Sequence, residues 1–164
     1  MEEIPQQNGR KLLIDADGCP VVRQAAQLAQ QYGFDCVLLC DTSHQFSIPG
    51  ARTITVSKGR DSADFALVNL AGPGDVAITQ DYGLAAMCLA KKAVVLNQNG
   101  LVYTQQNIGA LLAERHQSMK DRRAGVHKKG PPKRTPQQDE TFCQALRMLL
   151  QKVGGEYDFE KTGE

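Results

Sequence analysis

The stretch Lys11-Leu-Leu-Ile-Asp15 predicts a buried β-strand that ends in a carboxylate. Pro20 then opens an amphipathic helix that extends through Tyr32 and ends at Gly33, because proline fits the first turn of a helix and glycine fits its end. The next run, Asp35-Cys-Val-Leu-Leu-Cys-Asp41, is apolar throughout its middle, as parallel strands covered on both faces are. Strand, helix and strand in this order predict a βαβ unit with a parallel sheet.

The same alternation continues along the chain. Further strands are expected at 52–56, 76–79 and 93–96, and further helices at 61–71 and 82–92. A short extended segment at 101–103 precedes a helix that Thr104 caps and Gly125 ends. Thr135-Pro136 starts a last helix, whose apolar face consists of Phe142, Leu146, Leu149 and Leu150. The predicted fold class is α/β, a doubly wound and mostly parallel sheet with a C-terminal helix after a basic loop.

Length and composition limit the possible classes of protein. A chain of 164 residues fits one domain, which we expect at 11–152, with the basic loop at 120–134 inside it and flexible ends at 1–10 and 153–164. No apolar run approaches the roughly 18 residues that span a bilayer, and the polar N-terminus lacks the pattern of a signal peptide. Five scattered cysteines indicate free thiols in a reducing compartment. We therefore expect a cytoplasmic protein without membrane contact.

Aspartates follow the predicted strands and lie near helix starts. Asp15 and Asp17 end the first strand, Asp61 and Asp64 open the middle helix, and Asp81 follows the strand at 76–79. In an open parallel sheet the ligand site lies outside the carboxyl ends of the strands, so these side chains should meet there. Two carboxylates about 4.5 Å apart repel each other by roughly 4 kcal/mol at an effective dielectric near 20. A shared Mg²⁺ or Mn²⁺ ion, which prefers hard oxygen ligands, would relieve that repulsion.

Each aspartate also has a purely structural interpretation. Asp61 alone is more often a helix N-cap, Asp64 favours a helix dipole, Asp17 before Gly18 suits a turn, and Asp81 suits a cap. Caps and turns have no reason to gather at one edge of one sheet, so the joint pattern favours a shared site. The predicted metal ligands and catalytic residues are Asp15, Asp17, Asp64 and Asp81. Asp61 and Thr79 are expected to orient these ligands without contacting the metal.

Positive charge is concentrated in one segment. Between positions 120 and 134 seven residues are basic and one is acidic, although the net charge of the whole chain is only +1. Such a run is often just a solvated face, but it also suits contacts to phosphates. The residues expected to contact nucleic acid are Lys58, Arg60, Arg122, Arg123, Lys128, Lys129, Lys133 and Arg134. A negative site surrounded by positive charge suits a phosphodiester substrate.

Several motifs resemble one bacterial family. They are Leu13-Ile-Asp-Ala-Asp-Gly-Cys-Pro-Val21, Asp61-Ser-Ala-Asp64, Gly74-Asp-Val-Ala-Ile-Thr-Gln-Asp-Tyr-Gly-Leu-Ala85 and Lys129-Gly-Pro-Pro-Lys-Arg-Thr135. Over roughly residues 12–150 the chain resembles the YaiI/YqxD family, which is similar in turn to PIN-like nucleases. Two features depart from the family pattern: Gly18 stands where Ala is common, and Asn97-Gln-Asn-Gly100 lacks an Arg before its Gly.

The resemblance implies a three-layer sandwich and an activity. PIN-like nucleases hold Mg²⁺ or Mn²⁺ on acidic residues and hydrolyse RNA or DNA. By position, this implies that Asp15, Asp64 and Asp81 are ligands and that Asp17 is the second aspartate of the opening motif. The first hypothesis is thus a metal-dependent nuclease.

Two alternatives remain open at this stage. One is a haloacid-dehalogenase-like phosphatase with Asp15 as nucleophile and Asp17 as acid/base, because Ile14-Asp-Ala-Asp-Gly18 also resembles that nucleophile loop. It is disfavoured because Pro20 starts a helix at once and leaves no room for a flap hairpin. The other is a nucleic-acid-binding protein without catalysis.

Overall fold

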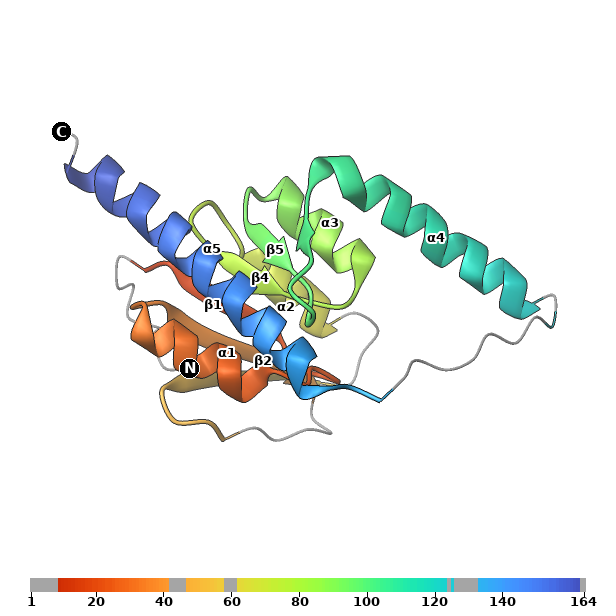
Figure 1. Cartoon of the computed structure of the whole chain (residues 1–164), viewed down its shortest axis with the longest axis horizontal. Helices are drawn as coiled ribbons and strands as arrows, with labels where there is room; N and C mark the ends of the chain where they lie inside the picture. The colour runs from red at the N-terminus through yellow and green to blue at the C-terminus, as the bar shows by residue number, and fades with distance from the viewer. Residues whose placement is uncertain (1–8, 42–46, 58–61, 124, 126–132, 163–164) are drawn as a thin grey trace.

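The computed structural model describes residues 9–41, 47–57, 62–123, 125 and 133–162. Six strands form one sheet in the order β3-β2-β1-β4-β5-β6 (Figure 1). In chain order the strands are β1 (Lys11–Asp15), β2 (Asp35–Asp41), β3 (Ala51–Val56), β4 (Val76–Ile78), β5 (Val94–Leu96) and β6 (Val102–Tyr103). All neighbours are parallel except β5 and β6, which are antiparallel. The predicted doubly wound, mostly parallel sheet is confirmed.

Helices cover both faces of the sheet, which makes three layers. The helices are α1 (Val22–Gln31), α2 (Ser62–Leu70), α3 (Tyr82–Ala90), α4 (Gln105–Arg123) and α5 (Pro136–Thr162). Helices α1 and α5 pack on one face, and α2, α3 and the start of α4 pack on the other. The helices and strands expected from the sequence agree with the structure to within about two residues at most ends, apart from the C-terminal helix.

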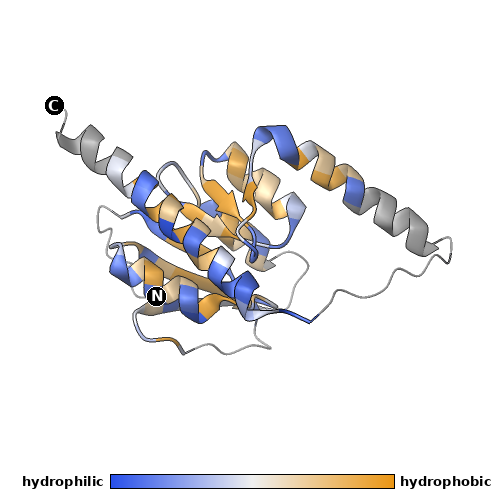
Figure 2. Ribbon diagram, viewed as in Figure 1, coloured by the Kyte–Doolittle hydropathy of each residue, from blue (hydrophilic) through white to orange (hydrophobic). Residues whose placement is uncertain are grey.

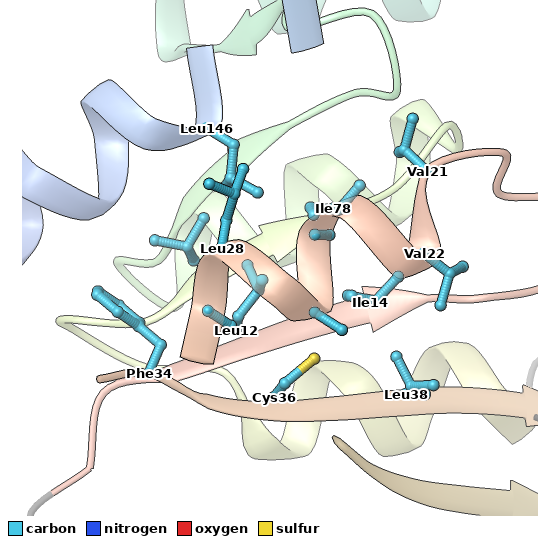
Figure 3. Close-up of a cluster of buried hydrophobic side chains, with 14 of the residues drawn as sticks. Leu12, Ile14, Val21, Val22, Leu28, Phe34, Cys36, Leu38, Ile78 and Leu146 are labelled. Atoms are coloured by element: carbon cyan, nitrogen blue, oxygen red, sulfur yellow. The ribbon is translucent and has the colours of Figure 1, made fainter. Parts of the chain in front are cut away.

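Consecutive residues of strand β1 are apolar because the strand contributes side chains to two hydrophobic cores, one on each face of the sheet. Leu12 and Ile14 point toward α1, whereas Leu13 belongs to the core on the opposite face (Figure 3). Figure 2 shows that hydrophobic residues are concentrated in the strands of the sheet, whereas the helices that cover it contain both hydrophobic and hydrophilic residues. Full burial of one such side chain contributes about 2 kcal/mol. The two cores thereby fix the position of β1, whose carboxyl end carries Asp15.

Helix α5 is longer than the sequence predicted. The chain was expected to be flexible from Val153 onward, but the helix continues to Thr162. Val153 is only 7% exposed and extends the apolar series of Leu146 and Leu150 onto the core. Gly154 follows, where an added Cβ would lie 2.8 Å from Nη1 of Arg10. Tertiary packing therefore outweighs the poor helix propensity of the two glycines at 154 and 155.

The structure also limits the extent of the basic loop. Residues 120–123 are helical and belong to α4, and Gly125 follows with a positive φ of 81°, as expected for the end of a helix. Residues 124 and 126–132 of the expected loop at 120–134, and residues 1–8 of the expected flexible N-terminus at 1–10, lie outside the described residues.

All five cysteines are free thiols, as predicted. Among the helices that the structure describes, none is both long and apolar enough to cross a bilayer.

Candidate active site

The carboxyl ends of β1 and β4 lie side by side and bring Asp15 next to Thr79. Ile14 pairs with Ile78 in the parallel ladder, so the residues that follow them meet beyond the sheet edge. The Thr79 hydroxyl donates a hydrogen bond of 2.8 Å to Oδ2 of Asp15 and accepts one of 3.0 Å from the backbone N–H of Asp81. Thr79 is 1% exposed. This buried hydroxyl therefore orients the Asp15 carboxylate and links it to Asp81.

Asp81 has a structural role as well as a place in the site. Its Oδ1 accepts hydrogen bonds from the backbone N–H groups of Gly83, at 2.8 Å, and Leu84, at 3.2 Å. It is thus the N-cap of α3, as the structural interpretation of the sequence suggested. The cap fixes the carboxylate at the end of β4. A capping role and a place in the site are compatible here.

The loop after β1 is held by hydrogen bonds to both neighbouring strands. Oδ2 of Asp17 accepts a hydrogen bond of 3.0 Å from the N–H of Asp41, at the end of β2. On the other side, Nε2 of Gln80 donates to the carbonyl of Gly18 at 2.9 Å. Gly18 has a φ of 74°, in the left-handed region that favours glycine. Asp17 is therefore more than a turn residue, because its side chain joins the loop after β1 to the end of β2.

Three of the four predicted carboxylates line one cavity of about 460 Å³. Among the described residues, its wall includes Asp15, Asp17, Gly18, Gln80, Asp81 and Tyr82. The fourth, Asp64 in α2, lies near enough for its charge to act on Asp15. Burial raises the pKa of Asp15 to about 6; the Thr79 hydrogen bond lowers it, and the charges of Asp64, Asp17 and Asp81 raise it. Asp61, predicted to support the site, lies outside the described residues.

The donor atoms of this cavity suit a hydrated divalent ion better than a dehydrated one. Within the described ranges, no three His, Cys, Asp or Glu side chains already meet as ligands of one ion. Mg²⁺ does not require such a cage, because it usually keeps several waters and binds through one or two carboxylates and substrate phosphates. Carboxylate oxygens are the hard donors that Mg²⁺ and Mn²⁺ prefer. The residues therefore fit an ion held through one or two carboxylates, with the others acting through water.

Sequence comparison assigns the chain to a family. The model described as "Uncharacterized BCR, YaiI/YqxD family" matches residues 13–152, which include every carboxylate of the site. The chain belongs to the YaiI/YqxD family. No solved structure gives a significant match.

Several curated relatives of this family align over most of their length, and each is named UPF0178 protein. The relative from Exiguobacterium sibiricum is 51% identical over 85% of this chain and 96% of its own. The one from Ruminiclostridium cellulolyticum is 46% identical over 85% of this chain and 92% of its own. A relative from Clostridium acetobutylicum is 44% identical over 87% of this chain and 97% of its own.

Asp75 shows that not every aspartate of this family member belongs to the site. It is buried at the amino-terminal edge of the sheet, where Oδ1 accepts from the N–H of Lys11 at 2.9 Å and Oδ2 from the N–H of Gly72 at 3.0 Å. Oδ2 also pairs with Nζ of Lys11 at 3.0 Å. Asp75 therefore has a structural role in the turn that leads into β4.

Arg134, one of the predicted phosphate contacts, makes three interactions within its own chain. Its Nε pairs with Oδ1 of Asp139 at 2.5 Å, Nη1 donates to Oδ1 of Asn99 at 2.7 Å, and Nη2 donates to the carbonyl of Gln98 at 2.7 Å. The guanidinium thus connects the start of α5 to the turn at 97–100, the turn that departs from the family pattern. These contacts give Arg134 a structural role, whereas Lys133 beside it is exposed.

The other predicted phosphate contacts are not placed by the structure. Arg122 and Arg123 lie in α4, and their side chains are outside the described part of the chain; the same holds for the whole of Lys58, Arg60, Lys128 and Lys129. Sequence reasoning missed the remaining cavity wall, formed by Gly18, Gln80 and Tyr82. Gln80 and Tyr82 flank Asp81 in the sequence, which was the available signal.

Proposed function

We propose that this chain is a divalent-metal-dependent phosphodiesterase that cleaves nucleic acid in the cavity at the ends of β1 and β4. The observation that carries the proposal is the position of Asp15. Its carboxylate is held by a buried hydroxyl, and it faces the same cavity as Asp17 and Asp81. A carboxylate whose pKa is raised to about 6 by burial and by neighbouring negative charges gains most from a cation.

Each residue then has a definite task. Asp15 and Asp81 would hold Mg²⁺ or Mn²⁺ through carboxylate oxygens, while Thr79 keeps Asp15 oriented. Asp17 and Asp64 would act through water molecules. A bound divalent ion supplies a hydroxide near neutral pH and neutralises the charge that develops on the phosphate. A phosphodiester substrate would bind through this ion, because without the ion the negative charge of the phosphate would be repelled by the aspartates.

The phosphatase alternative is supported less well. In that mechanism Asp17 transfers a proton to the leaving group, but here its Oδ2 accepts a hydrogen bond from the Asp41 amide. Helix α1 begins at Val22, so the short chain between it and Asp17 leaves no room for a flap hairpin. A phosphatase of this type would also form an aspartyl-phosphate on Asp15, which intact-protein mass spectrometry can detect after incubation with a phosphomonoester.

The test combines metal binding with turnover. Calorimetry with Mg²⁺ and Mn²⁺ is paired with cleavage of labelled RNA and DNA, and a phosphomonoester serves as the comparison substrate. The variants are Asp15→Asn and Asp81→Asn. Asparagine caps a helix as well as aspartate does, so Asp81→Asn removes the charge without removing the cap of α3. Asp35→Asn is the matched control, because Asp35 begins β2 at the opposite edge of the sheet.

We expect cleavage only with divalent metal, and an affinity for metal that falls at least tenfold in both site variants but not in Asp35→Asn. Binding of nucleic acid without metal-dependent cleavage would favour a non-catalytic protein. A trapped aspartyl-phosphate would favour the phosphatase.

A further inference from the structure

The main chain of Thr79 is held on two sides at the point where β4 leaves the sheet. The ladder between β4 and β5 ends at the pair Ile78 and Leu96. Beyond that pair, the N–H of Thr79 donates to the carbonyl of Leu96 at 3.1 Å, and the carbonyl of Thr79 accepts from the Tyr103 hydroxyl at 3.2 Å. The first bond continues the sheet, whereas the second comes from a side chain of β6. Tyr103 therefore fixes the main chain where the ladder has ended.

Tyr103 is itself firmly placed. It is the last residue of β6, pairs with Val95 in the antiparallel ladder and is only 2% exposed. Burial raises the pKa of Tyr103 to about 12, so its hydroxyl remains a protonated donor well above neutral pH. A phenylalanine would fill the same space in the core. The contribution that is specific to tyrosine at this position is thus the hydrogen bond to Thr79.

The ring of Tyr103 contacts the chain on the other side of Asp81. The ring centroids of Tyr103 and Tyr82 lie 6.0 Å apart with the ring planes at 70°, an edge-to-face pair. Tyr82 follows Asp81 directly and is the first residue of α3. One side chain from β6 thus holds the chain before Asp81 through its hydroxyl and the chain after Asp81 through its ring.

Two carboxylates of the site depend on the position of Thr79. The Thr79 hydroxyl donates to Asp15 at 2.8 Å and accepts from the N–H of Asp81 at 3.0 Å. The direction of this hydroxyl follows the main chain closely, because a β-branched side chain has few accessible χ1 rotamers. A displacement of the Thr79 main chain would therefore alter both hydrogen bonds, and a functional site tolerates displacements of only about 0.5 Å.

We infer that Tyr103 is a positioning residue of this site: its hydroxyl holds the main chain at Thr79 and thereby places Asp15 and Asp81 for the ion. The inference rests on the proposed function for the ion, whereas the contact between Tyr103 and Thr79 does not. Because Tyr103 is buried, it contacts neither the ion nor the substrate and acts only through its neighbours.

The test removes one hydroxyl and leaves the ring in place. The variant is Tyr103→Phe. Tyr32→Phe is the matched control, because the Tyr32 hydroxyl also makes one hydrogen bond, accepted from Nε2 of Gln151 at 3.1 Å, and lies at the end of α1.

Two quantities are measured in each protein. Calorimetry gives the affinity for Mn²⁺, and NMR in EDTA gives the hydrogen exchange rates of the Thr79 and Asp81 amides without any metal. The amide of Leu38, in the middle of β2, serves as the reference for global unfolding.

In Tyr103→Phe we expect the affinity for Mn²⁺ to fall about 3- to 10-fold, the effect on an equilibrium of losing one neutral hydrogen bond. Exchange at Thr79 and Asp81 should become faster by a similar factor relative to Leu38, because this segment opens more easily. Tyr32→Phe should change neither quantity. In a Thr79→Val background, Tyr103→Phe should weaken Mn²⁺ binding little further, since both substitutions act on the same contact to the ligands.

Several results would overturn the inference. Equal losses of affinity in Tyr103→Phe and Tyr32→Phe would indicate general destabilisation, and an unchanged affinity in Tyr103→Phe would indicate a residue that only fills the core. Weaker Mn²⁺ binding without faster exchange at Thr79 and Asp81, or losses that add in the double variant, would mean that Tyr103 does not act through Thr79.

Absence of Mn²⁺ binding by the wild type would overturn the proposed function, and the exchange rates alone would then decide the inference. Faster exchange confined to Thr79 and Asp81 in Tyr103→Phe would sustain the placement of this segment by Tyr103. Unchanged exchange would overturn it.

Discussion

Replacement of Asp15 with Asn measures how much the negative charge of Asp15 lowers the free energy of unfolding. Burial raises the pKa of Asp15 from its ordinary 3.8 to about 6 despite the hydrogen bond from Thr79. A rise of this size corresponds to about 3 kcal/mol of folding free energy that is lost when Asp15 ionises. Asparagine has the same shape, carries no charge and still accepts the Thr79 hydrogen bond. At pH 8 we therefore expect Asp15→Asn to be more stable than wild type by up to about 3 kcal/mol, an upper limit because the side chain is partly exposed.

The difference should depend on pH in a defined direction. The pKa of Asp15 in the folded protein lies above that in the unfolded chain, so the folded state binds the proton more tightly. The contribution of Asp15 is fully present below about pH 4 and is lost as the pH rises through about 6. Wild type and Asp15→Asn should consequently be equally stable near pH 4 and differ by a constant amount above about pH 7.

Urea unfolding of both proteins across this pH range, in EDTA, is the measurement. In thermal unfolding of a chain of 164 residues, the same 3 kcal/mol corresponds to a melting temperature about 6 to 12 °C higher in the variant than in wild type at pH 8. Mg²⁺ should then stabilise wild type more than the variant, because it binds the folded carboxylate. If Asp15→Asn is less stable than wild type at pH 8, the carboxylate is a structural hydrogen-bond acceptor, and the reasoning from buried charge is refuted.

Three further substitutions test the roles assigned to Thr79, Arg134 and Lys133. Thr79→Val keeps the shape of the side chain but removes the hydroxyl that bonds both Asp15 and the Asp81 N–H. Urea unfolding at pH 7 should therefore show a free energy of unfolding about 1 to 3 kcal/mol lower than that of wild type. An unchanged midpoint would mean that water replaces the hydroxyl. Arg134→Ala should lower the free energy of unfolding by about 1 to 2 kcal/mol and leave the salt dependence of nucleic-acid binding unchanged. Lys133→Ala should leave the midpoint of urea unfolding unchanged and reduce the slope of log affinity against log salt by about 0.7 to 0.9. A reduced slope in Arg134→Ala, measured by anisotropy, would restore its predicted role in phosphate binding.

The order of elements, and the sheet edge at which the candidate site lies, could be predicted from local sequence patterns. An uninterrupted apolar run such as Leu12 to Ile14 is stable only between two layers, so the sequence alone predicts a strand covered on both faces. Parallel strands place their carboxyl ends at one edge, so Asp15 and Asp81 could be assigned to the same edge before any contact was known.

Contacts between distant segments were decided only by the tertiary structure. The hydrogen bond from Thr79 to Asp15 joins residues 64 positions apart, and those from Arg134 reach back about 35 positions. Nothing in the local sequence distinguishes an arginine that pairs with its own chain from one that would contact phosphate. Helix α5 continues through Val153 because that side chain is buried against the core, a gain that helix propensity does not contain. Apolar residues that repeat at every second position in a strand, or at every third to fourth position in a helix, indicate which face of that element is buried. Which residues that face contacts depends on the packing of the whole domain.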